Sequence, residues 1–335
     1  MDLNVPIIWA LALCLVLGAA GAIIFAGFGN RLGFLDRPHE RSSHRVATPK
    51  GGGIGILAAF VCLSIFYDIP AGFWIPAVIV SLVGLYNDRR DLSPGLRLLA
   101  QSIAALVLIV AMRAVAPDSL RQIFLIVLCA VFIVGTSNFY NFMDGINGIA
   151  AVTAVLALGF MAVYLHLNGL SRNFIYLSSG LSLACLGFLP FNMPAARVFM
   201  GDVASLLIGF IYAGLIIVFT HDLLSFVCLA SFIFLFYADE LTTMLLRLKD
   251  KENLLRPHRR HLYQILSNEY RVAHWKVSLG YGVAQFVIGA SILGLKSAGL
   301  TVVLVLIVLY SFGFSLFSFF IRRNLLKRSS SGFSK

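Results

Sequence analysis

Residues 5–27 read VPIIWALALCLVLGAAGAIIFAG, an apolar run without a single charged residue. A helix needs about 20 apolar residues to cross the hydrocarbon core of a bilayer, and this run is long enough. Ten further apolar runs follow, each bounded by charged residues or by Gly and Pro, at about 53–67, 72–86, 98–113, 121–137, 146–165, 173–189, 203–219, 223–246, 276–294 and 299–321. The pattern predicts an all-α, polytopic membrane helix bundle with about eleven transmembrane helices.

The composition of the whole chain agrees with a membrane bundle. Of the 335 residues 59% are hydrophobic and 12% are charged, whereas an ordinary soluble domain has about 25% charged residues. A collagenous or disordered chain is excluded because 28 Phe accompany only 10 Pro. We expect one transmembrane domain over residues 1–321 and a basic tail over 322–335. The first run is longer than a signal-peptide core and has no Lys or Arg before it, so we expect a retained helix.

Lys and Arg are unevenly distributed between the two sets of loops that eleven spans create. One side carries 22 of the 26 cations, and the other carries Arg113, Arg121, Arg172 and Lys296. The positive-inside rule then places the N-terminus outside and the C-terminus in the cytoplasm. We therefore expect these cations to face a lipid bilayer and no nucleic acid, although the net charge is +11.

Eleven of the 15 Asp and Glu residues also fall on or near the cation-rich side. The positive-inside rule concerns Lys and Arg and does not predict this clustering of acids. A site that holds a metal ion and several phosphates would explain it. We expect the chemistry on the cytoplasmic face.

Two polar segments on that side flank the second and third apolar runs. The first, Thr48–Gly53, places Lys50 before three glycines that open a helix, where the backbone could approach a phosphate closely. Close helix packing explains such glycines equally well. In the second segment a helix ends at Asn87 and Asp88, which form either a solvated helix end or part of a site.

Two more polar segments interrupt the central runs. Asn138, Asn141, Asp144 and Asn147 recur at intervals of three with no Lys or Arg nearby. Such a set in apolar surroundings is costly unless it meets a ligand, an ion or a polar partner. Asp202 begins an apolar run, where it could cap the helix or bind Mg²⁺.

The ninth run carries an acid well inside it. Asp239, Thr243 and Arg247 fall on one helix face at a spacing of four, with Asp239 about 12 Å above Arg247. An acid that deep should face a partner or a cavity.

The longest loop on the cation-rich side, residues 247–276, contains Arg259, Arg260 and His261. This basic cluster could bind anionic lipid headgroups or clamp a diphosphate. The remaining histidines of interest are interpreted as solvated and without a role: His166, His221 and His274. Carboxylates, cations and phosphate-binding helix ends on one face together indicate Mg²⁺-assisted phosphoryl transfer, with a lipid phosphate as acceptor. The absence of a Gly-x-x-x-x-Gly-Lys-Ser/Thr loop argues against an ATPase.

In this order, the segments resemble the polyprenyl-phosphate N-acetylhexosamine-1-phosphate transferases. The collinear motifs are Pro49–Gly53, Asn87-Asp88, Asn138–Gly145, Phe199–Asp202 and the loop ending in His261. The resemblance implies transfer of a sugar 1-phosphate from a UDP-N-acetylhexosamine to undecaprenyl phosphate, with release of UMP, at the cytoplasmic face of a bacterial inner membrane. A homodimer is compatible with the sequence, and the oligomeric state is left open.

The resemblance also implies roles for single residues. Asp202 matches the aspartate that binds Mg²⁺, for which Mn²⁺ is the alternative. Asp88, Asp144 and His261 match catalytic positions, Asp88 being the aspartate proposed to activate the lipid phosphate. Phe199 matches an aromatic residue that stacks on uracil. The other expected substrate-binding residues are Lys50, Asn138, Asn141, Asn147, Arg259 and Arg260.

Asn87 and Asn147 depart from the family pattern, since many members have aspartates at both positions. Asn87 cannot act as a base, whereas Asn147 could still hydrogen-bond a uracil edge. The loop reads His-Leu-Tyr-Gln and lacks the run of histidines of the peptidoglycan branch, which points to the O-antigen-initiating branch. The sugar is left open among GlcNAc, GalNAc, FucNAc and QuiNAc, and direct attack and a covalent Asp88 intermediate are both compatible with the sequence.

Two rival functions remain for comparison. A transporter would relay ions through acids near the midplane, but the acids here lie near one face and no internal repeat is found. A CDP-alcohol phosphatidyltransferase also uses Asp-Gly motifs, yet Asp144–Ile149 lacks the Ala-Arg of that family. Release of UMP, of CMP or of neither nucleotide separates the three.

Overall fold

The computed structural model describes residues 4–38, 43, 46–113, 119–253 and 258–332. The prediction of an all-α bundle is confirmed, since the described strands are only a short antiparallel pair, β1 (Leu35–Asp36) with β2 (Thr48–Pro49). The helices are α1 (Asn4–Phe28), α2 (Ile54–Phe66), α3 (Ala71–Arg89), α4 (Pro94–Arg113), α5 (Leu120–Met143), α6 (Ile149–Leu167), α7 (Arg172–Asn192), α8 (Asp202–Phe219), α9 (Leu223–Ser231), α10 (Phe234–Lys249), α11 (Leu262–Gln264), α12 (His274–Leu295) and α13 (Leu300–Gly332).

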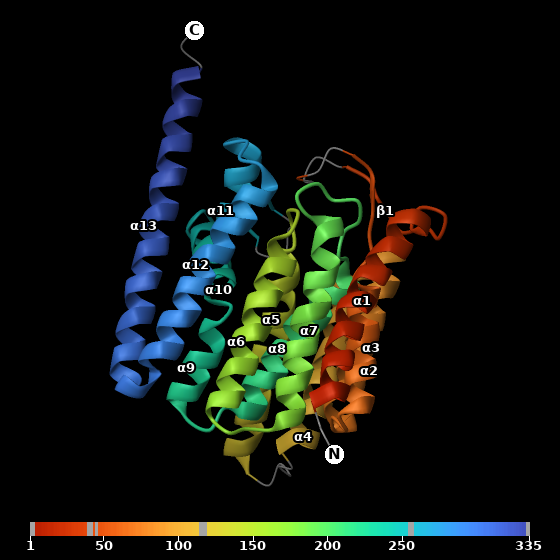
Figure 1. Cartoon of the computed structure of the whole chain (residues 1–335). Helices are drawn as coiled ribbons and strands as arrows, with labels where there is room; N and C mark the ends of the chain where they lie inside the picture. The colour runs from red at the N-terminus through yellow and green to blue at the C-terminus, as the bar shows by residue number, and fades with distance from the viewer. Residues whose placement is uncertain (1–3, 39–42, 44–45, 114–118, 254–257, 333–335) are drawn as a thin grey trace.

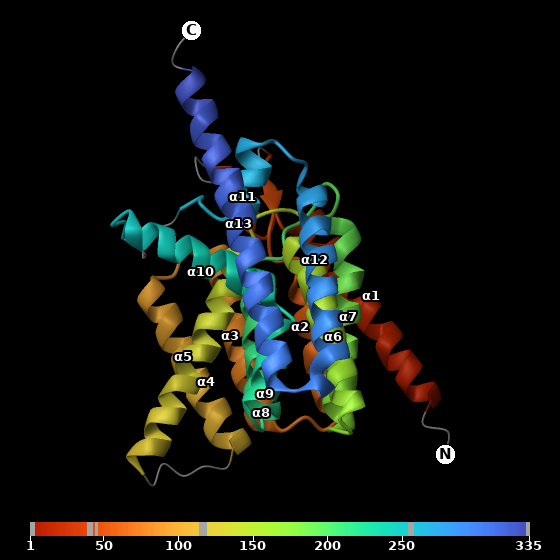
Figure 2. The ribbon, with the colours of Figure 1, turned by 90° about the vertical axis from the view of Figure 1, so that its left-hand side faces the viewer.

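Every predicted apolar run is helical. Within the described residues, nine helices are long and apolar enough to span a membrane, and α2 is a shorter apolar helix. The ninth run is broken, because α9 and α10 meet at an angle of 88°. Figure 2 shows α10 running across the direction of the other helices. The count of eleven spans and the membrane orientation stay predictions.

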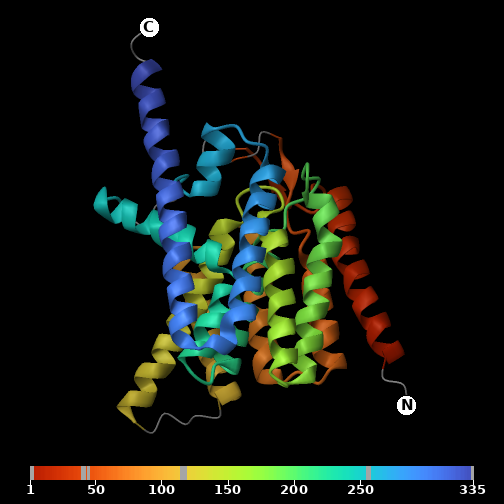
Figure 3. The ribbon, with the colours of Figure 1, turned by 60° about the vertical axis from the view of Figure 1, so that its left-hand side comes forward.

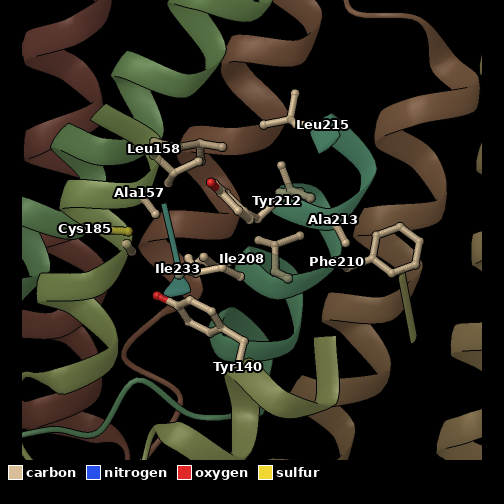
Figure 4. Close-up of a cluster of buried hydrophobic side chains, with 14 of the residues drawn as sticks. Tyr140, Ala157, Leu158, Cys185, Ile208, Phe210, Tyr212, Ala213, Leu215 and Ile233 are labelled. Carbon is tan, nitrogen blue, oxygen red and sulfur yellow. The ribbon is translucent and has the colours of Figure 1, made fainter. Parts of the chain in front are cut away.

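Helix α8 forms the centre of the bundle. In the membrane-spanning part of α8, 89% of the residues are buried inside the protein. This is expected for a helix that is apolar on all faces. Helices α3 and α5 pack most extensively against it, and Figure 4 shows Tyr140, Leu158 and Cys185 near Ile208 and Tyr212. The two buried tyrosine hydroxyls donate to the carbonyls of Ala150 (2.6 Å) and Leu229 (2.7 Å), which offsets their burial.

The two ends of the chain lie at opposite ends of the bundle. Helix α1 begins at the lower end in Figure 1, whereas α13 finishes above the upper end. Figure 3 shows α13 on the outside of the bundle, and only 11% of its spanning window is buried. The predicted domain boundary at residue 322 falls inside α13, so Arg322 and Arg323 continue this helix; residues 333–335 lie outside the described residues.

The turn of α10 changes the interpretation of its polar face. Asp239, Thr243 and Arg247 are 0%, 0% and 3% exposed, which confirms that they share one buried face. Their spacing runs along a helix bent by 88° from α9, and not along a straight span. The separation of about 12 Å between Asp239 and Arg247 therefore runs along α10, which lies across the other helices (Figure 2).

Candidate active site

A cavity of about 270 Å³, here called the site cavity, lies where α3 and α5 end and α8 begins. It is at the end of the bundle beyond which α13 projects (Figure 1). Seven predicted site residues line it: Lys50, Asp88, Asn141, Asp144, Asn147, Phe199 and Asp202. The fold thus gathers side chains from motifs up to 150 residues apart.

Asp202, the first residue of α8, is held by three side chains. Its Oδ1 accepts a hydrogen bond from Asn141 Nδ2 (2.8 Å), and its Oδ2 accepts one from Asn87 Nδ2 (2.7 Å). Arg97 Nη1 lies 3.3 Å from the same Oδ2. The N-cap of α8 is Gly201, and Asp202 is the first residue inside the helix. The interpretation of Asp202 as a helix cap is therefore excluded, and its side chain faces the site cavity.

Asp88 supplies the cap that α8 needs. It is 4% exposed, and its two carboxylate oxygens accept the backbone N–H groups of Asp202 and Val203, each at 3.1 Å. These amides have no partner within the helix, so a carboxylate at this end satisfies them and interacts favourably with the helix dipole. Lys50 Nζ lies 3.9 Å from Asp88 Oδ1. Asp88 thus joins α3 to the start of α8.

Asp144 differs from the other two carboxylates. It ends α5, and its backbone N–H donates to the carbonyl of Asn141 (3.1 Å). Within the described part of the chain its side chain has no hydrogen-bond or ion-pair partner. Burial, followed by the nearby charges of Asp202 and Asp88, raises the pKa of Asp144 well above its ordinary value. Its carboxylate is available to a ligand.

The glycines that follow Lys50 do not cradle a phosphate. The N–H groups of Gly52 and Gly53 donate to the carbonyls of Phe199 and Met200, each at 3.0 Å. A Cβ at Gly53 would lie 2.2 Å from the Cβ of Ala204. The expectation of a phosphate-binding backbone is wrong for these two amides, because they pair with the loop that carries Phe199.

Asn147 and Phe199 connect the site cavity to a second one. Both also line a cavity of about 590 Å³, here called the Arg259 cavity, together with Arg259. His274 lines both cavities, and its Nδ1 accepts the N–H of Asn147 (3.4 Å). The interpretation of His274 as solvated is therefore wrong, since its ring is half-buried and hydrogen-bonded. Its position just before an apolar run carried no motif that could have revealed this.

A third cavity, of about 740 Å³ and mostly apolar, lies between α4 and α5 and is called the α4–α5 cavity. Asn138 lines this cavity and not the site cavity, and its Nδ2 donates to Gln101 Oε1 (2.5 Å). Arg97 lines it too while contacting Asp202. Sequence reasoning missed Arg97, although Arg97 and Gln101 form a polar pair one turn apart in an apolar helix.

His261 and Arg260 lie outside the residues that line the site cavity. Arg260 forms ion pairs with Asp250 and Glu252 beyond the end of α10. His261 is 3% exposed, with Nε2 3.5 Å from Glu240 Oε1. Burial, and then the positive charge of two arginines, lowers the pKa of His261 to about 3. It is therefore neutral at pH 7, and its predicted contact with a diphosphate stays a prediction.

The oxygen donors of the site cavity suit a hard divalent cation. Carboxylate oxygens are the ligands that Mg²⁺ prefers, and Mg²⁺ sites commonly use one or two carboxylates together with substrate phosphates and water. Asp202 and Asp144 provide such a pair. Among the described residues, no group of three or more His, Cys, Asp or Glu side chains could hold a metal by itself. The donor set therefore fits Mg²⁺ held jointly with a phosphate ligand.

Comparison with known proteins shows which family the chain is similar to. Residues 70–220 match the model of glycosyl transferase family 4. The chain is 27% identical to an undecaprenyl-phosphate alpha-N-acetylglucosaminyl 1-phosphate transferase of Thermotoga maritima, over 76% of this chain and 80% of the relative. It is 26% identical to a probable undecaprenyl-phosphate N-acetylglucosaminyl 1-phosphate transferase of Bacillus subtilis, over 80% and 79%.

A mycobacterial relative matches a shorter part. The chain is 32% identical to a decaprenyl-phosphate N-acetylglucosaminephosphotransferase of Mycobacterium leprae, over 55% of this chain and 54% of the relative. The chain thus spans about half the length of that protein. The residues 70–220 that match the family model include Asp88, Asn141, Asp144, Phe199 and Asp202 of the site cavity.

Proposed function

Because this chain belongs to the family of polyprenyl-phosphate N-acetylhexosamine-1-phosphate transferases, we propose that it transfers a sugar 1-phosphate from a UDP-N-acetylhexosamine to undecaprenyl phosphate. The products are UMP and the lipid diphosphate sugar. One observation carries the proposal: Asp88, Asp144 and Asp202 come from three helices to one cavity that also holds a lysine. The transporter interpretation has no support from the related proteins.

The reaction exchanges one phosphoanhydride bond for another. An oxygen of the lipid phosphate forms a bond to the phosphorus that carries the sugar, and the bond from that phosphorus to the UMP oxygen breaks. The lipid phosphate has a second pKa near 6, so it is largely dianionic at pH 7 and needs little deprotonation. The main obstacle is the approach of one anion to another, which cations in the site reduce.

Positively charged groups at the site would ease the approach of the lipid phosphate to the diphosphate. Lys50 and Arg97 are the cations beside Asp88 and Asp202. Asp202 and Asp144 would hold Mg²⁺, or Mn²⁺ as the alternative. A bound divalent cation would neutralise charge on the diphosphate and polarise its phosphorus–oxygen bonds. Asn141 and Asn87 fix the orientation of Asp202 through its two oxygens.

The acceptor lipid has an apolar route to the site. The α4–α5 cavity is lined by bilayer-facing side chains such as Leu98, Val127 and Val131, which are 44%, 52% and 63% exposed. Arg97 lies at the polar end of this cavity and reaches Asp202. A polyprenyl chain in the cavity would therefore present its phosphate to Arg97, next to the carboxylates.

The donor nucleotide fits the opposite side of the site. Phe199 and Asn147 line both the site cavity and the Arg259 cavity. An aromatic face and an amide are suited to stacking on uracil and to hydrogen-bonding its edge. In this arrangement the diphosphate lies over the carboxylates, and Arg259 and His274 face the nucleotide sugar.

We place the product at the start of a cell-envelope polysaccharide, in the O-antigen-initiating branch, at the cytoplasmic face of a bacterial inner membrane. The branch rests on the His-Leu-Tyr-Gln sequence at residues 261–264, which lacks a run of histidines. The face rests on the excess of Lys and Arg on the loops around the site.

UMP release by purified protein tests the function. The assay contains undecaprenyl phosphate, Mg²⁺ and a panel of UDP-N-acetylhexosamines, with GlcNAc, GalNAc, FucNAc and QuiNAc as the sugars. We expect UMP that depends on lipid, on the divalent cation and on Asp202, with Asp202→Ala at least about 1000-fold slower, because Asp202 is proposed to hold the cation that stabilises charge.

Asp222→Asn is the matched control. Asp222 caps α9 at the opposite end of the bundle, and asparagine caps helices equally well, so this variant should keep the activity of the wild type. Folded wild-type protein that releases no UMP from any donor would contradict the proposal. Release of CMP from a CDP-alcohol, or ion flux in liposomes, would then identify the rival functions.

A further inference from the structure

Asp239 is a buried carboxylate outside the site cavity, and four donors surround it. It accepts the backbone N–H groups of Leu262 (2.8 Å) and Tyr263 (3.3 Å), at the start of α11. It also accepts the hydroxyls of Tyr281 on α12 (2.8 Å) and Thr243 on α10 (3.3 Å). The side chain is 0% exposed. Asp239 therefore ties the segment that begins at Leu262 to two helices of the bundle.

Tyr263 carries this attachment to the end of α5. Its ring is 0% exposed, and its hydroxyl donates to the carbonyl of Phe142 (2.9 Å). Phe142 lies in the last turn of α5, where carbonyls lack a partner within the helix. The hydroxyl also lies against Gly145, since a Cβ there would be 2.2 Å from it. Tyr263 thus contacts the residues on both sides of Asp144 in the chain.

The backbone N–H of Asp144 donates to the Asn141 carbonyl (3.1 Å), but nothing comparable among the described residues holds its side chain. Its side chain has no hydrogen-bond or ion-pair partner there, unlike Asp88 and Asp202. Its place in the site cavity therefore depends on its backbone. Gln264, the residue after Tyr263, lines the same cavity. Movement of the α11 segment would shift both side chains.

We infer that Asp239 and Tyr263 are positioning residues, which hold Asp144 in place through the end of α5. The inference rests on the proposed function, because it assigns Asp144 a reacting ligand. Asp239 holds the start of α11, Tyr263 holds Phe142 and Gly145, and these hold the carboxylate. The role requires no contact between Asp239 and a substrate.

Tyr263→Phe tests the inference with the smallest change. The ring stays in place, and the hydroxyl loses its hydrogen bond to the Phe142 carbonyl and its interaction with the Gln264 side chain. We expect kcat for UMP release to fall by about tenfold to 100-fold, since a small misplacement of a reacting group has effects of this size. KM for UDP-N-acetylglucosamine, or for the panel member that the wild type uses, should stay within about threefold, because the nucleotide contacts are unchanged.

Tyr270→Phe is the matched control. The Tyr270 hydroxyl also donates to a backbone carbonyl, that of Ile321 on α13 (2.8 Å), and it belongs to the same segment after His261. Tyr270 lines neither the site cavity nor the Arg259 cavity. Its kcat should remain within about twofold of the wild type, so a fall in kcat from Tyr263→Phe alone would not reflect general loosening of the segment.

Asp239→Asn, alone and combined with Tyr263→Phe, tests the connection between the two residues. Because both act through one chain of contacts, the double variant should lose no more activity than the more damaging single variant. If Asp239→Asn does not fold, Tyr263→Phe decides by itself. A Tyr263→Phe variant with the kcat of the wild type, a change confined to KM, or additive losses would overturn the inference and leave the proposed function intact. Wild-type protein without UMP release would overturn both.

Discussion

At the scale of single residues, three carboxylates around one cavity have three different environments. Asp88 accepts two backbone amides, Asp202 is held by two amides and a guanidinium, and Asp144 has no side-chain partner among the described residues. Carboxylates that are already hydrogen-bonded are less available for proton transfer than one that is not. The geometry therefore separates a capping role for Asp88 from the ligand-facing roles of the other two.

Replacing Asp88 by asparagine should reveal this capping role. An amide offers one oxygen, so one α8 amide would face the NH₂ group and stay unsatisfied, at a cost of about 1–3 kcal/mol. We expect a lower melting temperature in detergent and a lower kcat, with an unchanged shape of the pH–rate profile. If the variant instead lost the fall in rate at low pH, with no change in melting temperature, Asp88 would be supported as a base.

Buried His261 should make the stability dependent on pH. Its pKa is lowered to about 3 in the folded protein, whereas an unfolded histidine titrates near 6.5. Between these values the unfolded state binds more protons, so stability falls as the pH decreases. From pH 7 to pH 5 the loss is roughly 2 kcal/mol.

Thermal unfolding at pH 7 and pH 5 measures this effect. His261→Asn should lose less stability on acidification than the wild type, whereas His221→Asn, a change at an exposed histidine, should behave like the wild type. Equal pH dependence in the wild type and His261→Asn would contradict the burial effect.

At the scale of elements, the site depends on close contact between the backbones that meet at the start of α8. Gly201 has φ +78° and ψ 167°, a region that residues with a Cβ rarely adopt. A Cβ at this position would lie 2.5 Å from Asp88 Oδ2 and 2.8 Å from Gly51 N. Position 201 therefore requires glycine, because any Cβ would collide with Asp88 and with the backbone of Gly51.

Gly201→Ala should therefore damage both folding and catalysis. We expect a loss of about 1–3 kcal/mol from the backbone conformation alone, together with a fall in kcat because Asp88 is displaced. Gly280→Ala on α12 is the control, since a Cβ there meets nothing within 4 Å. The melting temperature and the rate of UMP release are measured for both variants. Equal values for Gly201→Ala and Gly280→Ala would contradict the packing requirement.

At the scale of the whole molecule, every element of the site cavity lies at one end of the bundle. This end is the one with the excess of Lys and Arg, including those of the loop before α12. The positive-inside rule predicts that such an end faces the cytoplasm, and the proposed reaction needs its UDP-sugar on that side. The proposed reaction therefore requires that this end of the bundle faces the cytoplasm.

Labelling of single cysteines tests the orientation. In a background without the five native cysteines, a membrane-impermeant maleimide should label His221→Cys in intact cells. Lys249→Cys, at the last residue of α10, should react only after lysis. The reverse pattern would place the site outside and contradict the proposed function. Activity in the labelled background provides the control for folding.

The apolar runs and the family motifs were readable in the sequence because each depends on neighbouring residues. Hydrophobic length predicted where helices occur, and motif spacing predicted Lys50, Asn141, Asp144 and Asp202 at the site, where the structure places them. The break between α9 and α10 was not predicted, because one apolar run continues through it. The residues Arg97 and His274 lie outside any motif and come to the site only through packing.

The sequence by itself therefore determined the class of fold, the helical segments and the set of polar motifs, since hydrophobic transfer and local spacing act along the chain. Only the tertiary structure decided which partner each polar group has. Asp88 meets the amides of α8, the Gly52 and Gly53 amides meet the Phe199 loop, and Asp239 meets α11. These contacts join residues 23 to more than 100 positions apart, and buried hydrogen bonds of this kind form only after the helices have packed.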